Sequence, residues 1–280
     1  MAYKDILVVL DADRATRRRI ETAAALAARF EAHVVGLYVT LIADSEPASP
    51  LFYPPLYDPI WRDVQETSAT RAERVRQTFE DVTSRHAVSA EWRSAAGYPG
   101  DVTVSHARYA DLVILGQLDP EDPRGPLLRP RPEEVALLAG RPVLVIPYVG
   151  RFDAIGRRAL VGWDASREAA RAIGDALPLL IQSKSVTIMS VDADKARDQG
   201  ETPAADLALH LARHGVAAQV ERTVSGGIGI GNTLLSRASD IEADLLVMGA
   251  YGHSRIRELL LGGATRTVLA SMTLPVLMAH

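Results

Sequence analysis

The segment ADLLVMGAYGHSRIRELLLGGATRTVLA, residues 243–270, decides the fold of this chain. It opens with the apolar run Leu245–Met248, which lacks Gly and Pro and ends at Gly249, as a buried parallel strand does. Glycine lets the backbone approach a ligand closely, and a helix N-terminus adds partial positive charge. The segment therefore predicts a strand that feeds a helix start through an anion-binding turn, with further glycines at Gly252, Gly262 and Gly263 and a helical pattern from Ala264.

The glycine spacing, G-x2-G-x9-G-G, is neither the Walker pattern nor the dinucleotide fingerprint. It resembles the nucleotide-binding motif of the universal stress protein family, G-x2-G-x9-G-[ST], and departs from it at Gly263. Asp244 and the strand pattern Pro275-Val276-Leu277 follow the family's order. For the glycines alone, an ordinary turn with helix-cap glycines and no ligand is an open alternative.

The chain contains this unit twice. Residues 110–116 match residues 243–249, and 141–146 match 274–279, each pair 133 residues apart. Residues 6–13 match 159–166 at an offset of 153, so the first copy carries a net insertion of 20 residues. A two-fold repeat of this length indicates domain duplication, because solenoid repeats are shorter.

Alternating strands and helices predict an α/β fold with two tandem Rossmann-like, doubly wound domains, residues 1–150 and 151–280, joined near 151–158. Each domain is expected to have a five-stranded parallel sheet with helices on both faces. The strands are predicted at 6–10, 34–39, 88–93, 112–115 and 143–146, and then at 159–163, 186–191, 217–223, 245–248 and 276–278.

Four helices are predicted in the first copy, at 15–30, 67–86, 102–109 and 132–139. The run Arg17-Arg18-Arg19 is expected on the solvated face of the first of them. In the second copy the helices are expected to begin near Ser166, Ala204, Asn232 and Ala264, with Asn232 as a cap.

The resemblance covers nearly the whole chain, but only the second copy has all the motif glycines. It implies that this copy binds ATP or a related adenine nucleotide, with which Mg²⁺ could bind. Asp164 stands where the family's nucleotide binders carry an Asp, although Asp and Ser here would equally serve as N-caps. Met248 would equally be a residue of the hydrophobic core that does not contact the nucleotide. The implied site residues are Trp163, Asp164, Ser166, Val191, Met248, Gly249, Gly252, Gly262, Gly263, Ala264 and Thr265.

The first copy keeps only Gly116 of the motif, since Asp119, Arg129 and Pro130 stand at the other glycine positions. The acids Asp119, Glu121 and Asp122 would lie where phosphates lie, so this site is predicted to have lost nucleotide binding in the family's manner. Contacts from the side chains of Arg124, Arg129 and Arg131 to phosphate are the alternative.

The composition of the chain argues against several classes of function. A net charge of −4 and a pI of about 6.0 argue against nucleic acid as the main partner. No run approaches the roughly 20 apolar residues that a membrane span needs, and no cysteine is present for disulfides or thiol chemistry. We therefore expect a cytoplasmic protein. The insertion near 40–65 contains the aromatic, proline-rich stretch 51–61. It is interpreted as a loop packed on its own domain or, alternatively, as a lid or a partner patch.

These features favour a stress-response or regulatory protein with no assigned catalytic residue and at most slow ATPase activity. The alternatives are a weak ATP hydrolase that uses Asp164 or His253, and an interaction scaffold without a ligand. No metal-site spacing occurs among the histidines. The family further implies that the two domains pair as an intramolecular pseudo-dimer through 143–146 and 276–278, with homodimerisation and an unknown protein partner left open.

Overall fold

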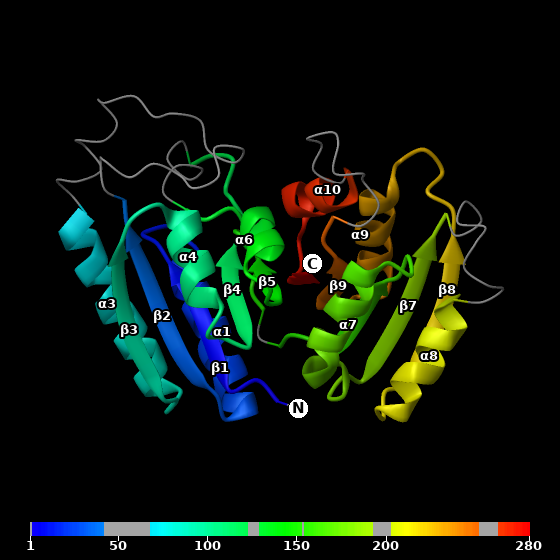
Figure 1. The fold of residues 1–280 in the computed structure, drawn as a ribbon, viewed down its shortest axis with the longest axis horizontal. Coiled ribbons are helices and arrows are strands. Elements are labelled where there is room, and N and C mark those ends of the chain that lie inside the picture. Colours follow the sequence, from blue (N-terminus) through cyan, green and yellow to red (C-terminus); the bar gives the residue numbers. More distant parts are fainter. Residues whose placement is uncertain (1, 42–67, 123–128, 153, 193–202, 252–262) are drawn as a thin grey trace. The chain divides into compact units, whose positions relative to one another are not determined.

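The structure is a computed structural model that describes residues 2–41, 68–122, 129–152, 154–192, 203–251 and 263–280. The chain divides into two compact units, Ala2–Arg151 and Phe152–His280. Each unit is a parallel sheet with helices on both faces, so the predicted α/β fold class and its tandem arrangement are confirmed (Figure 1). Most of the insertion predicted near 40–65 lies outside the described residues.

In the N-terminal unit strands and helices alternate along the chain. The elements are β1 (Asp5–Leu10), α1 (Thr16–Phe30), β2 (His33–Thr40), α3 (Ser68–Arg85), β3 (Ala90–Ala96), α4 (Pro99–Ala107), β4 (Leu112–Gly116), α6 (Pro132–Leu138) and β5 (Val143–Ile146).

The C-terminal unit repeats the alternation. Its elements are β6 (Arg158–Gly162), α7 (Arg167–Leu180), β7 (Ser185–Val191), α8 (Pro203–Arg213), β8 (Ala218–Thr223), α9 (Ile230–Asp240), β9 (Leu245–Gly249), α10 (Gly263–Ser271) and β10 (Val276–Ala279).

The strand order is β3-β2-β1-β4-β5 in the first unit and β8-β7-β6-β9-β10 in the second. All these pairings are parallel. In each unit the chain winds outward in one direction from the first strand and then returns to its other side. The order therefore reverses between β1 and β4, and between β6 and β9. Ligands of open α/β sheets bind at the carboxyl ends of strands beside such a reversal.

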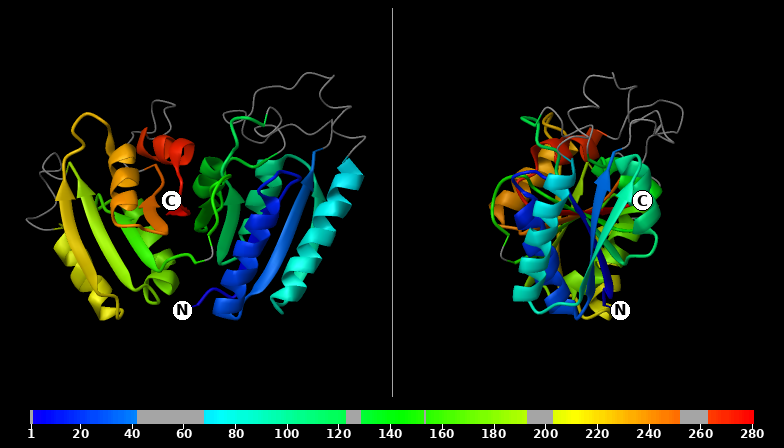
Figure 2. Two further views of the ribbon diagram at one scale, coloured as in Figure 1. Left: turned by 180° about the vertical axis from the view of Figure 1, so that it is seen from behind. Right: turned by 90° about the vertical axis from the view of Figure 1, so that its left-hand side faces the viewer.

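The central strands are apolar on both faces because helices cover both (Figure 2). Residues 112–114 of β4 and 245–247 of β9 are fully buried. In the N-terminal unit α1 packs with α3 on one face, and α4 packs with α6 on the other. No helix in the described ranges is long and apolar enough to cross a membrane.

Two local predictions were wrong. Asn232 does not cap α9: Gly229 is the N-cap, and the Asn232 side-chain amide, one turn inside the helix, donates to the carbonyl of Ile228 (2.9 Å). The second error concerns the arginine run, because Arg19 is almost fully buried while Arg17 is exposed. Three consecutive helix positions span about 200°, which exceeds the solvated face of a helix packed on a sheet.

Candidate functional site

The sequence-predicted site residues of the C-terminal unit lie at the carboxyl ends of neighbouring strands. Trp163, Asp164 and Ser166 follow β6, Val191 ends β7, Met248 and Gly249 end β9, and Gly263, Ala264 and Thr265 open α10. Gly252 and Gly262, like His253, lie outside the described residues. The segment after β9 contacts the start of α10, since the backbone N–H of Tyr251 donates to Thr265 Oγ1 (3.4 Å).

Asp164 and Ser166 together form the start of α7. The Ser166 hydroxyl accepts a hydrogen bond from the backbone N–H of Ala169 (3.1 Å), which makes Ser166 the N-cap. Asp164 Oδ1 accepts from both the backbone N–H (3.0 Å) and the hydroxyl (2.6 Å) of Ser166. The capping alternative is thus correct for Ser166. Asp164 orients that cap while its own side chain stays exposed at the sheet edge.

Among the described residues of this edge, three other than glycine adopt left-handed backbone. They are Ala165 (φ 58°) after β6, Asp192 (φ 55°) after β7 and Tyr251 (φ 64°) after β9. Such a conformation costs on the order of 1 kcal/mol for a side chain with a Cβ, and it concentrates at functional sites. Left-handed turns also direct successive N–H groups into concavities that hold anions.

Sequence reasoning missed Asp192. Its carboxylate accepts from the backbone N–H (2.9 Å) and the hydroxyl (2.8 Å) of Ser225, the residue that opens the glycine-rich loop after β8. Its own N–H donates to the carbonyl of Thr223 (2.9 Å). Asp192 therefore fixes the end of β7 against the end of β8. An Asp directly after a predicted buried strand is the signal that could have identified it.

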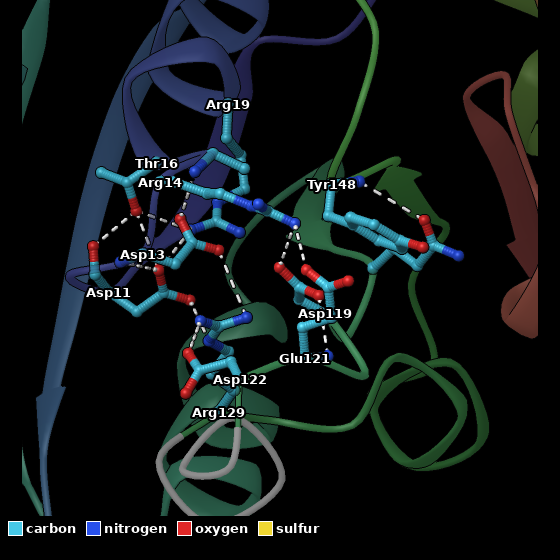
Figure 3. A network of polar contacts seen from close by, with 12 residues as sticks. Asp11, Asp13, Arg14, Thr16, Arg19, Asp119, Glu121, Asp122, Arg129 and Tyr148 are labelled. Carbon is cyan, nitrogen blue, oxygen red and sulfur yellow. Dashed lines mark hydrogen bonds and ion pairs between the residues drawn. The ribbon is translucent and has the colours of Figure 1, made fainter.

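The equivalent edge of the N-terminal unit holds a buried square of alternating charges (Figure 3). Arg19 Nη2 contacts Asp11 Oδ1 (2.8 Å) and Asp13 Oδ1 (3.5 Å). Arg129 contacts the other oxygen of each carboxylate, with Nε 3.1 Å from Asp11 Oδ2 and Nη1 3.3 Å from Asp13 Oδ2. We call these four residues the charge square.

The charge square is extended on one side by the segment after β4. Arg129 Nη2 donates to Asp122 Oδ2 (2.6 Å). Nearby, Arg14 pairs with Asp119 (2.8 Å) and contacts the ring of Tyr148 (5.9 Å from guanidinium carbon to ring centroid). Arg129 therefore contacts carboxylates of the protein. The sequence alone had left open whether its side chain would contact phosphate.

The pKa values of the two aspartates in the charge square are shifted in opposite directions. Burial alone would raise the pKa of Asp11, but the charges of Arg19 and Arg129 and hydrogen bonding with Asp13 and Thr16 outweigh it and lower the pKa to about 2. For Asp13, burial dominates and the charge of Asp11 adds to it, so its pKa is raised despite both arginines. Asp11 thus remains ionised at neutral pH and anchors the square.

The two edges carry different residues at equivalent positions. At an offset of 153, Asp11 corresponds to Asp164, but Asp13 corresponds to Ser166 and Arg19 to Ala172. At the offset of 133, Arg129 corresponds to Gly262. The N-terminal edge therefore has bulky charged side chains at three positions where the C-terminal edge has small residues.

Known proteins give the same division of the chain. The model of the universal stress protein family matches residues 2–147 and again residues 156–280. The chain belongs to the universal stress protein family. A curated relative, universal stress protein Slr1230 of Synechocystis sp., is 32% identical over an alignment of 99 residues that covers 28% of this chain and 34% of that protein. The match therefore spans about a third of the relative's length.

Solved structures of universal stress proteins share the tandem fold. One from Archaeoglobus fulgidus DSM 4304 superposes with a TM-score of 0.73 at 18% identity, covering 98% of this chain and 97% of that one. A putative universal stress protein from Pseudomonas aeruginosa UCBPP-PA14 gives a TM-score of 0.62 at 17% identity, with 99% and 93% covered. At these identities the likeness establishes the fold.

Proposed function

We propose that this universal stress protein binds ATP or a related adenine nucleotide at the carboxyl edge of β6, β7 and β9, in a stress-response or regulatory role. The observation that carries the proposal is the set of left-handed turns at Ala165, Asp192 and Tyr251, one after each of these strands. In the described N-terminal unit, the non-glycine residues with this backbone, Glu31 and Ala87, instead follow helices. Among the described residues, left-handed turns of this kind at the ends of strands therefore occur in the C-terminal unit alone, and such turns can form the concavities that hold anions.

The smaller side chains at two positions of the C-terminal edge support the same assignment. Ala172 and Ser166 occupy the positions of Arg19 and Asp13, so these two charged side chains of the other domain have no counterpart there. Asp164 is exposed and lies beside the start of α7, where a carboxylate can accept a hydrogen bond from a ribose hydroxyl or contact Mg²⁺ on phosphate.

Gly263 departs from the family motif without a steric reason. A Cβ built on this residue would meet no described atom within 4 Å, so a serine would fit. Its hydroxyl would stand at the first turn of α10, where the helix N-terminus already favours an anion. The glycine therefore leaves the backbone donor in place and omits only a side-chain donor.

Calorimetric titration of the full chain with ATP is expected to give one site. Asp164→Asn should weaken binding about tenfold, the effect of losing a hydrogen bond to a charged acceptor. Gly263→Ser should strengthen binding, because it adds a donor beside the phosphates. Asp240→Asn is the matched control: this residue ends α9 before β9 begins, whereas the site residues Met248 and Gly249 lie at the other end of β9, and its side chain is 61% exposed.

Three results would contradict the proposal. Two equal sites per chain would show that the N-terminal edge also binds. No heat of binding with wild type or Gly263→Ser would favour the scaffold without a ligand. An unchanged affinity in Asp164→Asn would remove Asp164 from the site.

Turnover is expected to be far below about 1 per second, the low end of ordinary enzymes. Phosphoryl transfer needs a group that positions the attacking oxygen and a charge that stabilises the phosphate in flight. Asp164 is the exposed acid beside α7, and among the described residues no group of three His, Asp or Glu could hold a metal ion. Steady-state phosphate release measures this. Turnover at ordinary rates that Asp164→Ala abolishes would instead establish the hydrolase.

A further inference from the structure

The glycine-rich loop between β8 and α9, residues 225–231, begins beside the end of β7. The Asp192 carboxylate accepts hydrogen bonds from the backbone N–H (2.9 Å) and the hydroxyl (2.8 Å) of Ser225. In the sheet register Val191, a predicted nucleotide contact, pairs with Thr223, two residues before Ser225. Figure 1 shows the loop leaving the tip of β8 and reaching α9. Its start is therefore fixed to the strand that carries Val191.

The far end of the loop lies against the first turn of α10. A Cβ added to Gly231 would lie 2.9 Å from the carbonyl oxygen of Ala264, another predicted nucleotide contact, and 2.8 Å from Cβ of Thr267. A residue without a side chain permits so close an approach. The loop therefore runs from the end of β7 to the start of α10, along the proposed nucleotide site.

Between these ends the loop holds Ile228 in a defined but exposed position. The backbone N–H of Ile228 donates to the carbonyl of Ser225 (3.1 Å), and its carbonyl accepts from the Asn232 amide (2.9 Å). Ile228 is nevertheless 58% exposed. A Cβ added to either neighbour, Gly227 or Gly229, would meet no described atom within 4 Å. Ile228 thus presents aliphatic surface with free space beside it.

The chemistry of the loop suits the uncharged part of a nucleotide. Residues 224–236 include no charged side chain, and the Asp192 carboxylate at the start of the loop would repel phosphate oxygens. Phosphates are favoured instead at the N-terminus of α10. Ligand sites are lined mainly by apolar side chains, which pack on the faces of a ring such as a base.

Resting on the proposed function, we propose that residues 225–231 are the base-contacting segment of the site. Ile228 packs on the face of the adenine, and Asp192 is the positioning residue that holds the loop at the end of β7. The base and the phosphates then contact different segments, the loop after β8 and the start of α10. The loop thereby sets the affinity for the base, separately from the motif glycines.

Calorimetric titration of full-length variants with ATP tests the contact in both directions. Ile228→Ser is expected to weaken binding about fivefold, because it removes most of the apolar contact surface. Ile228→Phe is expected to strengthen binding about fivefold, because an aromatic ring stacks on a base. The matched controls are Leu209→Ser and Leu209→Phe. Leu209 lies on α8 and is 55% exposed, so neither change should alter the affinity.

Hydrogen exchange without nucleotide tests the positioning role of Asp192. In Asp192→Asn, the amides of residues 225–228 are expected to exchange about tenfold faster, because a neutral amide oxygen accepts more weakly than a carboxylate. Asparagine tolerates the left-handed backbone of this position, so the turn itself is kept. Adding Ile228→Phe to Asp192→Asn should strengthen ATP binding less than it does in wild type, because the loop is no longer held in place.

The outcomes separate this inference from the proposed function. ATP binding that is unchanged in both Ile228 variants, or weakened in both, would overturn the inference and leave the proposed function standing. An equal gain from Ile228→Phe in wild type and in Asp192→Asn would overturn the role of Asp192. No heat of binding between ATP and wild type would overturn the proposed function and this inference together.

Discussion

Replacing Arg19 by methionine is expected to destabilise the N-terminal domain by about 3–5 kcal/mol, the range seen when one partner of a buried ion pair is removed. Arg19 is among the most buried side chains of the protein, and it contacts Asp11, Asp13 and the Thr16 hydroxyl. Methionine fills a similar volume, so the loss would come from the charge and its hydrogen bonds. Asp11 and Asp13 would keep Arg129 but lose half of their cationic partners.

Urea denaturation of the full chain, followed by hydrogen exchange to separate the two domains, measures the effect. Arg17→Met is the matched control on the same helix. Arg17 pairs with Glu21 (3.2 Å) on the surface, its side chain is 55% exposed, and such pairs contribute about 0–1 kcal/mol. Similar losses from the two substitutions would show that the charge square adds little to stability.

A stronger form of the test replaces all four members of the square by apolar residues. Buried ion clusters are often no more stabilising than well-packed hydrophobic side chains of the same shape. The single variant and the four-fold variant therefore distinguish two quantities: the cost of leaving a carboxylate without its partner, and the net contribution of the whole square. We expect the first to be large and the second small.

The strands could be predicted because their physical signal is local. Residues 112–115 and 245–248 are short apolar runs bounded by Asp and Gly, and a strand covered on both faces needs such a run. The repetition of the Asp-Leu-Val/Leu pattern at a constant offset added the tandem arrangement. The outer strands were found as well, although the C-terminal one, β8, is largely exposed.

The charge square could not be predicted from the sequence. Arg19 and Arg129 lie 110 residues apart, and the sequence does not encode their distance in space. A run of three arginines most often indicates a solvated helix face, and here two of its members lie outside the core while the third faces Asp11. The acids after β4 suggested the loss of a phosphate site, but not that Arg129 would pair with Asp11, Asp13 and Asp122.

Gly249→Ala is expected to destabilise the C-terminal domain by about 1–3 kcal/mol, the cost of overpacking a close contact. A Cβ on this residue would lie 2.5 Å from the backbone nitrogen of Ala169 and 2.8 Å from the carbonyl carbon of Glu168. Both atoms belong to the first turn of α7, which cannot rotate away as a side chain could. The first motif glycine therefore lets the helix lie directly on the end of β9.

Gly174→Ala is the control with the opposite expected sign. Gly174 lies within the same helix, and an added Cβ would meet no described atom within 4 Å. Alanine there should stabilise the domain by about 0.5–1 kcal/mol, because it lowers the conformational entropy lost on folding.

Denaturation midpoints and ATP titrations of the two variants separate packing from binding. A protein with Gly249→Ala that is destabilised but still binds ATP with unchanged affinity would make this glycine a packing residue alone. Unchanged stability together with lost binding would contradict the packing argument and show that the backbone of Gly249 has to meet the ligand. If both fall together, as we expect, the end of β9 has to be free of a side chain both for the packing of α7 and for the binding of the nucleotide.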